Sequence, residues 1–282
     1  MQDPDERSRT NEIVTPHQTT LLKLVDSYLQ STQVSPTSSQ SSDVLKIHEI
    51  LGSFLAKRFF TMSEYAQKAM QRSLGMLPPE RSRSNGEDVS ATERGSSDSA
   101  SSSKSTKNVP SSSPSAQSGS PGIPQELDVM LPKVCEALVL ITQCIVTICL
   151  EAEEQQTRLD NGFPNSGPFT NMKNYFILKR HAEVGVVEDL IELLNLLDVF
   201  LPRINFGKPV NADGTPITTA QSKVADSSGF SYLKRDLVRL LGVLCHGVKT
   251  VQDRVREAGG LPVVMNLCVI DERNPCKSYT LY

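Results

Sequence analysis

The alternation of apolar and polar positions is most regular between Leu233 and Asp271, where it predicts three short helices. In the first of these, leucines recur at spacings of three and four, and charged residues occupy the positions between them. The leucines are Leu237, Leu240, Leu241 and Leu244, and the residues expected on the opposite, solvated side are Lys234, Arg235, Asp236 and Arg239. The second helix is predicted over Thr250–Ala258, with Thr250 as its cap and Val251, Val255 and Ala258 inside. Each helix is therefore expected to bury one face.

Glycine and proline separate the second predicted helix from the third. Gly259 and Gly260 are expected to supply the positive φ that ends the second helix, and Pro262 falls in the first turn of the third, where its missing N–H costs nothing. The third helix, Leu261–Cys268, is expected to place five apolar residues inside: Leu261, Val264, Met265, Leu267 and Cys268. An isolated helix cannot hide this much apolar surface, so the three helices are predicted to stack on neighbours.

A second copy of this pattern lies upstream. Gly185–Leu194 aligns with Gly259–Cys268, so that Val187 matches Leu261 at an offset of 261 − 187 = 74 residues. An armadillo unit has about 40 residues, and the offset suits two such units, one of them interrupted by a loop. The predicted fold is therefore all-α, an armadillo-like α-solenoid with a Ser-rich disordered insert.

The stretch DLVRLLGVLCHGVKTVQDRVREAGGLPVVMNLCVIDERNP resembles the C-terminal signature of the ataxin-10 family, including its fungal members. The resemblance is carried by Asp236–Cys245, Gln252–Gly260 and Asp271–Pro275. The residues expected to form the structural signature of this segment are Leu237, Leu240, Leu241, Leu244, Val255, Gly259, Gly260, Pro262, Val264 and Leu267. After Pro275 the chain reads CKSYTLY, where relatives continue into a further amphipathic helix. A truncated chain or a wrong gene prediction is expected, with apolar surface left uncovered from Leu261 onward.

What this resemblance implies is a non-enzymatic protein-interaction scaffold of the ataxin-10 type. The family's role suggests regulation of cytokinesis and cell division in the cytoplasm, together with self-association. Two alternatives stay open: an armadillo-type transport adaptor, although the chain has no tryptophan for a peptide-clamping groove, and a cysteine-based metal-binding protein.

The N-terminal region, residues 1–77, is expected to be helical, and the stretch that follows it has few apolar residues. Helices are predicted over Thr19–Gln30, Val44–Phe60 and Ser63–Leu74. From Pro78 to Pro124 serine dominates, and this stretch is predicted to be disordered. Proline-directed serines at Ser113 and Ser120, and serines in a basic context at Ser82 and Ser84, are candidate phosphorylation sites. An inert linker is the alternative.

The predicted helix Lys133–Arg158 is apolar on nearly every side, which is typical of a membrane span or of a central core helix. Glu136 and Gln143 interrupt it, and no basic flank or aromatic belt follows, so a central solenoid helix is favoured. A further helix, Val187–Leu201, ends before Pro202. The expected organisation is a helical region at 1–77, a linker at 78–124, solenoid units at 125–206, a polar loop at 207–229, the ataxin-10-like unit at 230–275 and a divergent tail at 276–282.

Composition adds little and excludes several kinds of chemistry. The 282 residues carry a formal net charge of −3, and the start MQDPDER resembles neither a secretory signal nor a transit peptide, so the cytoplasm is the expected compartment. Six cysteines without CxxC spacing are expected to be reduced core residues, and Cys245 beside His246 is read as a core thiol next to a surface imidazole. Basic residues in the last helices are offset by acidic ones, which argues against nucleic-acid binding. No catalytic, cofactor-binding or metal-binding residues are predicted, and neither a membrane nor a small-molecule substrate is expected.

Two consequences for mutation follow from the predicted faces. Leu241→Asp and Val264→Asp should each unfold the C-terminal helices, because each places a charge on a packed face. Arg254 is predicted to be exposed and to tolerate replacement by aspartate.

Overall fold

The structure is a computed structural model that describes residues 13–33, 41–77, 128–161, 171–210, 214–216, 230, 232–267, 269 and 271–272. The contact pattern divides the chain into one part formed by Met1–Leu77 and Leu127–Tyr282 and a second part, Pro78–Glu126. The second part lies outside the described residues, and so does the Ser-rich insert predicted from the sequence. Everything below concerns the first part.

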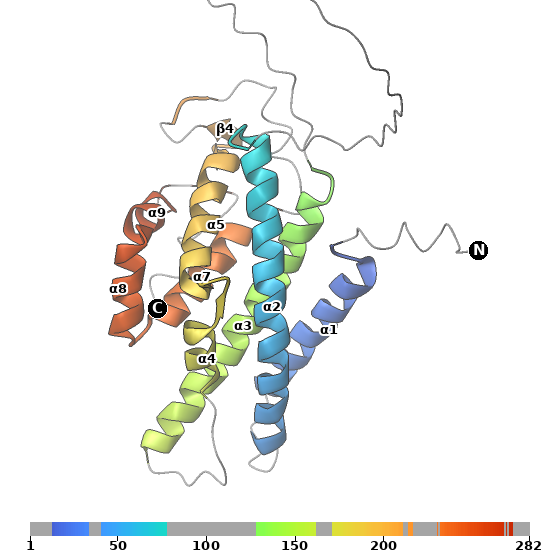
Figure 1. Cartoon of the computed structure of the whole chain (residues 1–282), viewed down its shortest axis with the longest axis vertical. Helices are drawn as coiled ribbons and strands as arrows, with labels where there is room; N and C mark the ends of the chain where they lie inside the picture. Colours follow the sequence, from blue (N-terminus) through green and yellow to red (C-terminus); the bar gives the residue numbers. More distant parts are fainter. Residues whose placement is uncertain are drawn as a thin grey trace, which may run out of the picture. The chain divides into compact units, whose positions relative to one another are not determined.

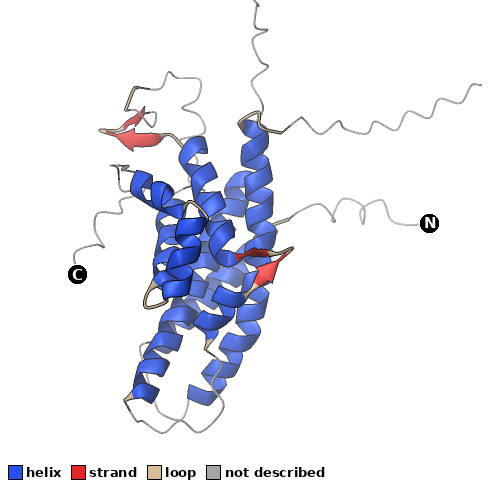
Figure 2. Cartoon of the chain, turned by 60° about the vertical axis from the view of Figure 1, so that its left-hand side comes forward, coloured by secondary structure: helices blue, strands red, loops and turns tan. Residues whose placement is uncertain are grey.

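This part is mostly helical, as predicted. Its described helices are α1 (Pro16–Gln33), α2 (Ser41–Ser73), α3 (Leu131–Asp160), α4 (Met172–Leu178), α5 (Val186–Phe200), α7 (Leu233–Cys245), α8 (Lys249–Glu257) and α9 (Gly260–Leu267) (Figure 1). Two short antiparallel hairpins accompany them, β1 (Arg180–His181) with β2 (Val184–Gly185) and β3 (Arg203–Asn205) with β4 (Lys208–Val210), drawn in red in Figure 2. The sequence pattern predicted neither hairpin, and β4 lies within the stretch read as a polar loop. The class is all-α with these local additions.

Helix α1 begins earlier than the apolar pattern suggested, because the sequence carries a capping box. The backbone N–H of Gln18 donates to Thr15 Oγ1 at 3.2 Å, and the backbone N–H of Thr15 donates to Gln18 Oε1 at 3.1 Å. Pro16 stands at the first helical position, where its fixed φ suits the helix. The motif Thr-Pro-His-Gln is thus a start signal that periodicity alone does not register.

Helix α2 is continuous, and the break predicted between Phe60 and Ser63 is wrong. No glycine or proline occurs there, and the buried stripe runs straight through the proposed gap, with Phe59, Met62 and Ala66 all buried. A helix with an uninterrupted buried face has no physical reason to end. The two predicted elements are one helix of 33 residues.

Helix α3 is the central helix of this part. It packs against α1, α2, α4 and α7, which explains why its apolar residues point to nearly every side. By length and composition, Leu131–Arg158 could cross a membrane, with a mean hydropathy of 1.9 in its most apolar window, but 61% of that window is buried among the other helices. This pattern of burial is typical of a core helix.

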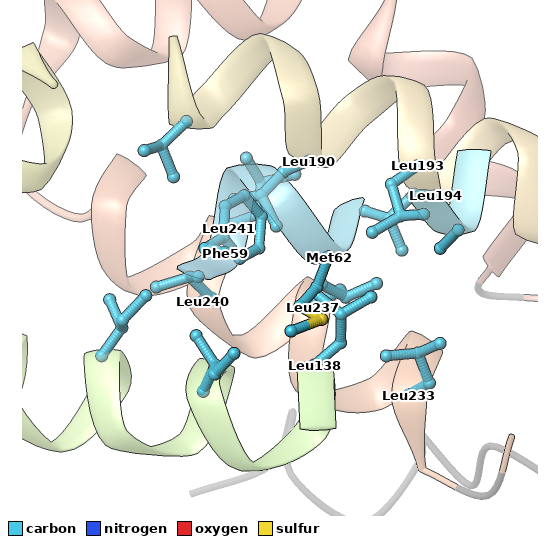
Figure 3. Packing of buried hydrophobic residues seen from close by; sticks show 14 of the residues in the cluster. Phe59, Met62, Leu138, Leu190, Leu193, Leu194, Leu233, Leu237, Leu240 and Leu241 are labelled. Carbon is cyan, nitrogen blue, oxygen red and sulfur yellow. The ribbon is translucent and has the colours of Figure 1, made fainter. Parts of the chain in front are cut away.

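The core forms where α2, α3, α5 and α7 meet. Figure 3 shows Phe59 and Met62 from α2, Leu138 from α3, and leucines from α5 and α7 converging on one cluster of buried side chains. Each such residue contributes about 1.5–3 kcal/mol when it is fully buried. Helix α5 is covered on several sides, by α2, α7, α8 and α9, and ends before Pro202 as predicted.

Candidate interaction site in the C-terminal unit

Helices α7, α8 and α9, with the short segments that flank them, form what we call the C-terminal unit, residues 232–272. Its first helix buries the leucine stripe singled out in the sequence against α3 and α5. These residues are Leu237, Leu240, Leu241 and Leu244, and Leu233 joins them. The four-residue recurrence places them on one face. Helix α7 is therefore the anchor of the unit.

The charged side of α7 is solvated only in part, since Arg239 is exposed as predicted and Arg235 is half-buried, whereas Lys234 and Asp236 are buried. Lys234 and Asp236 are each 1% exposed. The Lys234 ammonium lies 3.4 Å from Asp198 Oδ1 at the end of α5, and Arg203 of β3 approaches the same carboxylate at 3.2 Å. Burial lowers the pKa of Lys234, and the Asp198 carboxylate opposes that shift. The expectation of an exposed Lys234 is wrong because α5 and β3 bring a carboxylate and a second cation over the helix.

Asp236 is held from two directions. The side-chain amide of Gln143, on α3, donates to Asp236 Oδ2 at 2.8 Å, and the guanidinium of Arg235 approaches Asp236 Oδ1 at 2.7 Å. Buried carboxylates persist when they accept hydrogen bonds of this kind. Gln143, read in the sequence only as an interruption of an apolar helix, is a partner for this carboxylate.

Arg254 joins three helices and is not a free surface residue. Its Nε donates to Glu188 Oε1 at 2.8 Å and its Nη2 to Glu188 Oε2 at 2.6 Å, while Nη1 donates to the carbonyl oxygen of Ile177 at 2.9 Å. This contact lowers the pKa of Glu188 and raises that of Arg254. The bidentate geometry fastens α8 to the first turn of α5 and to the end of α4. The prediction of an exposed Arg254 is therefore wrong.

The link between α8 and α9 uses its two glycines in different ways. Gly259 has φ of +72°, as predicted for the residue that ends a helix. Gly260 does not share this conformation, since it is the first residue of α9. A Cβ there would lie 2.9 Å from the carbonyl oxygen of Val255 and 3.0 Å from Ile191 Cδ1. One glycine turns the chain, and the other allows α9 to approach α8 and α5 closely.

Helix α9 exposes much of the apolar surface that was expected inside. Val263 is buried, and Val264 and Leu267 are half-buried, but Leu261 is 53% exposed and Met265 is 69% exposed. Val269, just after the helix, is 52% exposed. The aligned residues of α5, Val187 and Ile191, are buried, because α5 is covered by neighbours on several sides. Similar sequences thus occupy an interior position in α5 and an edge position in α9.

We call Leu261, Met265 and Val269 the α9 ridge. Their spacing of four places Leu261 and Met265 on one side of α9, and Val269 is exposed two residues after the end of the helix. Pro262 is exposed beside them in the first turn. Val255 of α8 is buried behind the ridge against the rest of the unit.

The segment after α9 is tied to the β3–β4 hairpin. The backbone N–H of Ile204 donates to Asp271 Oδ1 at 3.1 Å, and the backbone N–H of Glu272 donates to the Ile204 carbonyl at 2.9 Å. The N–H of Gly207 donates to Glu272 Oε2 at 3.0 Å. Gly207 lies in a polar stretch that favours a turn, but nothing local indicated that Asp271 would accept from Ile204 or that Glu272 would accept from Gly207.

The cysteines that the structure describes are free thiols, buried at Cys135, Cys144 and Cys149 and half-buried at Cys245. Burial raises the pKa of the Cys135, Cys144, Cys149 and Cys245 thiols, which reach about 12 for Cys144. A thiol with a raised pKa is a poor nucleophile and a poor ligand at neutral pH. Among the residues that the structure describes, no group of three histidine, cysteine or acidic side chains is arranged to hold a metal ion.

His246 has an exposed ring, and its backbone carbonyl oxygen accepts a hydrogen bond from another helix. The Lys173 ammonium of α4 donates to the His246 carbonyl oxygen at 2.7 Å and is also paired with Glu153 of α3. His246 Nδ1 lies 3.4 Å from the same Glu153 carboxylate. Lys173 thereby joins α4, α3 and the end of α7. Cys268, Cys276 and the four candidate phosphoserines Ser82, Ser84, Ser113 and Ser120 lie outside the described residues.

Among the described residues, fold and site together define a mostly helical protein with a C-terminal three-helix unit that presents an apolar edge. The family model of the spinocerebellar ataxia type 10 protein domain matches residues 233–279, which contain this unit. The C-terminal part of the chain is thus similar to this domain, and the resemblance predicted from the sequence is confirmed.

Individual relatives agree with that match. The chain is 33% identical over 76 residues to the ataxin-10 homolog of Candida albicans, which covers 27% of this chain and 16% of that protein. It is 35% identical over 95 residues to ataxin-10 of Bos taurus, covering 32% and 18%, and 34% identical over 112 residues to the ataxin-10 homolog of Kluyveromyces lactis, covering 32% and 21%. The matched segments therefore span only a small share of these relatives. No solved structure matches the chain.

Proposed function

We propose that this chain is a non-enzymatic protein-interaction scaffold of the ataxin-10 type that acts in the cytoplasm during cell division, by regulating cytokinesis. The ataxin-10 domain at residues 233–279 and the similarity to ataxin-10 proteins of fungi and mammals support this proposal. The partners we propose are proteins, including further copies of the chain. Nucleic acids, membranes and small-molecule substrates are not part of the proposal, and no cofactor is invoked.

The armadillo-like arrangement belongs to the same proposal. In it, α7, α8 and α9 are one armadillo-type unit, and α5 is the corresponding last helix of the preceding unit. The alignment of Gly185–Leu194 with Gly259–Cys268 supports this, as does the packing of α5 against all three helices of the C-terminal unit. An apolar helix at the edge of such a stack is a natural place for a further protein surface to add.

The observation that carries the proposal is the α9 ridge. Leu261, Met265 and Val269 are each more than half exposed, and all three lie in the segment that matches the ataxin-10 domain. Exposed apolar surface forfeits about 25 cal/mol for each Å² that could be buried. Large exposed apolar patches are rare on monomeric soluble proteins, and they commonly mark surfaces that bind other proteins. The ridge is thus the surface we assign to scaffolding.

The test is a double variant of the full chain, Leu261→Ser with Met265→Ser, which removes the two ridge residues that lie on α9 without changing a buried residue. The control is Leu178→Ser, an equally large change at a 75%-exposed leucine on α4. Self-association is measured by light scattering of the purified chain, and co-purifying proteins from dividing cells are quantified. In cells that depend on the chain, the fraction that becomes multinucleate reports on cytokinesis.

The double variant should keep the thermal stability of the unaltered chain, lose self-association or defined co-purifying proteins, and raise the multinucleate fraction. The control should change none of these. A double variant that behaves like the control in all three measurements would contradict the proposal.

A further inference from the structure

Helices α1 and α2 form the walls of an apolar groove whose floor is α3. Both walls pack mainly on α3 and much less on each other. The cavity between them is lined by Leu21 and Leu22 from α1, by Phe54, Arg58 and Met62 from α2, and by Ile141 from α3. The groove lies on the N-terminal helices, outside the segment that matches the ataxin-10 domain.

The rims of this groove expose apolar side chains at helical spacing. On α1, Leu21 is 52% exposed and Leu24 is 62% exposed, with Tyr28 one turn further along. On α2, Phe54 is 40% exposed and Ile50, one turn before it, is 73% exposed. Tyr28 lies one turn from Leu24 along α1 and Ile50 one turn from Phe54 along α2, so each continues the exposed apolar side of its own helix. The exposed apolar side chains thus extend over about two helical turns on α1 and about one turn on α2, which suits the i, i+3, i+4 anchors of helix-in-groove contacts.

The charged residue that lines the groove is a cation. The Arg58 guanidinium lies over the Phe54 ring, 5.6 Å from its centroid, so it is held in place at the rim. Among the described residues, no carboxylate forms an ion pair with it. Glu136 of α3 is paired with Lys23 of α1 at 2.8 Å, so this carboxylate already has a cationic partner other than Arg58. A ligand that offers an acidic group would therefore meet an uncompensated positive charge at the edge of an apolar surface.

From these contacts we infer that the groove binds an amphipathic helix of a partner protein, with apolar residues three and four positions apart and an acidic residue that pairs with Arg58. Apolar anchors supply the affinity in such a complex, and the charge pair fixes the orientation and excludes basic helices. This inference deepens the proposed scaffold function, on which it rests, by adding a second surface and the chemistry of its partner.

The experiment uses the full chain and two labelled synthetic peptides. Both peptides are amphipathic helices with leucines spaced three and four residues apart, and they differ only in carrying glutamate or lysine beside the leucine face. Fluorescence anisotropy measures their dissociation constants. Three variants are compared: Arg58→Glu in the groove, Leu24→Ser on its rim, and Val199→Ser as a control at a 59%-exposed valine on α5.

The unaltered chain should bind the glutamate peptide at least tenfold more tightly than the lysine peptide, and Arg58→Glu should reverse that preference. Leu24→Ser should weaken both peptides severalfold, while Val199→Ser should leave the dissociation constants unchanged. A reversal of preference cannot arise from unfolding, so it separates recognition from loss of structure.

Equal binding of both peptides to the unaltered chain and to Arg58→Glu would overturn the inference. So would dimerisation that is abolished by Leu24→Ser and is not displaced by the glutamate peptide, because a second copy would then occupy the groove. Neither outcome touches the α9 ridge, whose test is self-association, co-purification and cytokinesis after Leu261→Ser with Met265→Ser. Failure of the groove and failure of the scaffold function are therefore distinguishable.

Discussion

Arg254 and Glu188 meet in a two-point contact, Nε to Oε1 at 2.8 Å and Nη2 to Oε2 at 2.6 Å, across the boundary between α8 and α5. The guanidinium also donates to the Ile177 carbonyl at the end of α4. One side chain thus joins the C-terminal unit to two earlier helices, through residues that lie 66 and 77 positions before Arg254 in the sequence. Its loss leaves both a carboxylate and a carbonyl without their donor.

Arg254→Ala is expected to lower the free energy of unfolding by about 2 kcal/mol, because charge-assisted bonds at a partly buried site are lost. The matched control is Arg256→Ala, two residues along the same helix, where the side chain pairs with Asp253 on the exposed surface. That change should stay within about 0.5 kcal/mol. Urea denaturation of the two variants makes the comparison. Equal losses would show that the contact with Glu188 adds nothing to stability.

Helix α9 offers a matched pair of substitutions that tests which of its faces is packed. Val263→Asp puts a carboxylate at a buried position and should cost about 3 kcal/mol or more, and Leu241→Asp in α7 should cost at least as much. Leu261→Asp, on the α9 ridge, should change stability by less than about 1 kcal/mol. Val264→Asp should fall between them because Val264 is half-buried. Thermal or urea unfolding that ranks Leu261→Asp with Val263→Asp would contradict the face assignment.

Asp189 on α5 should make the stability of the chain depend on pH. Its carboxyl accepts a hydrogen bond from the Gln67 side-chain amide of α2 at 2.7 Å, while its other oxygen, Oδ2, is buried without a partner. Burial raises the pKa of Asp189 from 3.8 to about 6. The folded state holds this proton to higher pH than the unfolded state. The contribution of Asp189 to the stability of the chain is therefore greatest below pH 3.8 and is lost as the pH rises through 6.

The size of that effect is about 3 kcal/mol, from roughly two pKa units at about 1.4 kcal/mol each. Asp189→Asn removes the titration and keeps an oxygen that can accept from Gln67. The difference in unfolding free energy between the variant and the unaltered chain should therefore shift in favour of the variant by about 2 kcal/mol between pH 4.5 and pH 7, because about 1 kcal/mol of the effect has already developed by pH 4.5. Parallel pH profiles for the two proteins would show that Asp189 does not titrate in this window.

Asp271 should protect the β3–β4 hairpin from opening. Its Oδ1 accepts the Ile204 N–H, so Asp271→Ala is expected to speed amide exchange at Ile204 by roughly tenfold, which corresponds to about 1.4 kcal/mol of local opening. Asp253→Ala, at an exposed position on α8, serves as the control and should leave the hairpin unchanged. Hydrogen exchange followed by mass spectrometry resolves the segment. Unchanged exchange in the Asp271 variant would mean that the other contacts hold the hairpin by themselves.

The sequence by itself determined the helical class, most of the helices and the similarity of the C-terminal segment to the ataxin-10 domain. The leucines of α7 recur at the helical period, Gly259 has the positive φ that ends α8, and Pro202 follows the end of α5. Each of these features depends on the backbone within one or two turns of the residue concerned. Local geometry of this kind is determined by neighbouring residues, which is why it could be predicted. The Thr15–Gln18 capping box was equally local and was available to be found.

Only the tertiary structure decided which faces are covered. Lys234, Asp236 and Arg254 occupy positions that an isolated helix would leave in water, and each is covered or paired because a distant element brings the complementary group: Asp198, Gln143 and Glu188. The reverse holds for Leu261 and Met265, which match buried residues of α5 and are nevertheless exposed on α9. Helical periodicity defines a face, but burial depends on what packs against that face. In this chain, those partners lie tens of residues away, beyond the reach of any local pattern.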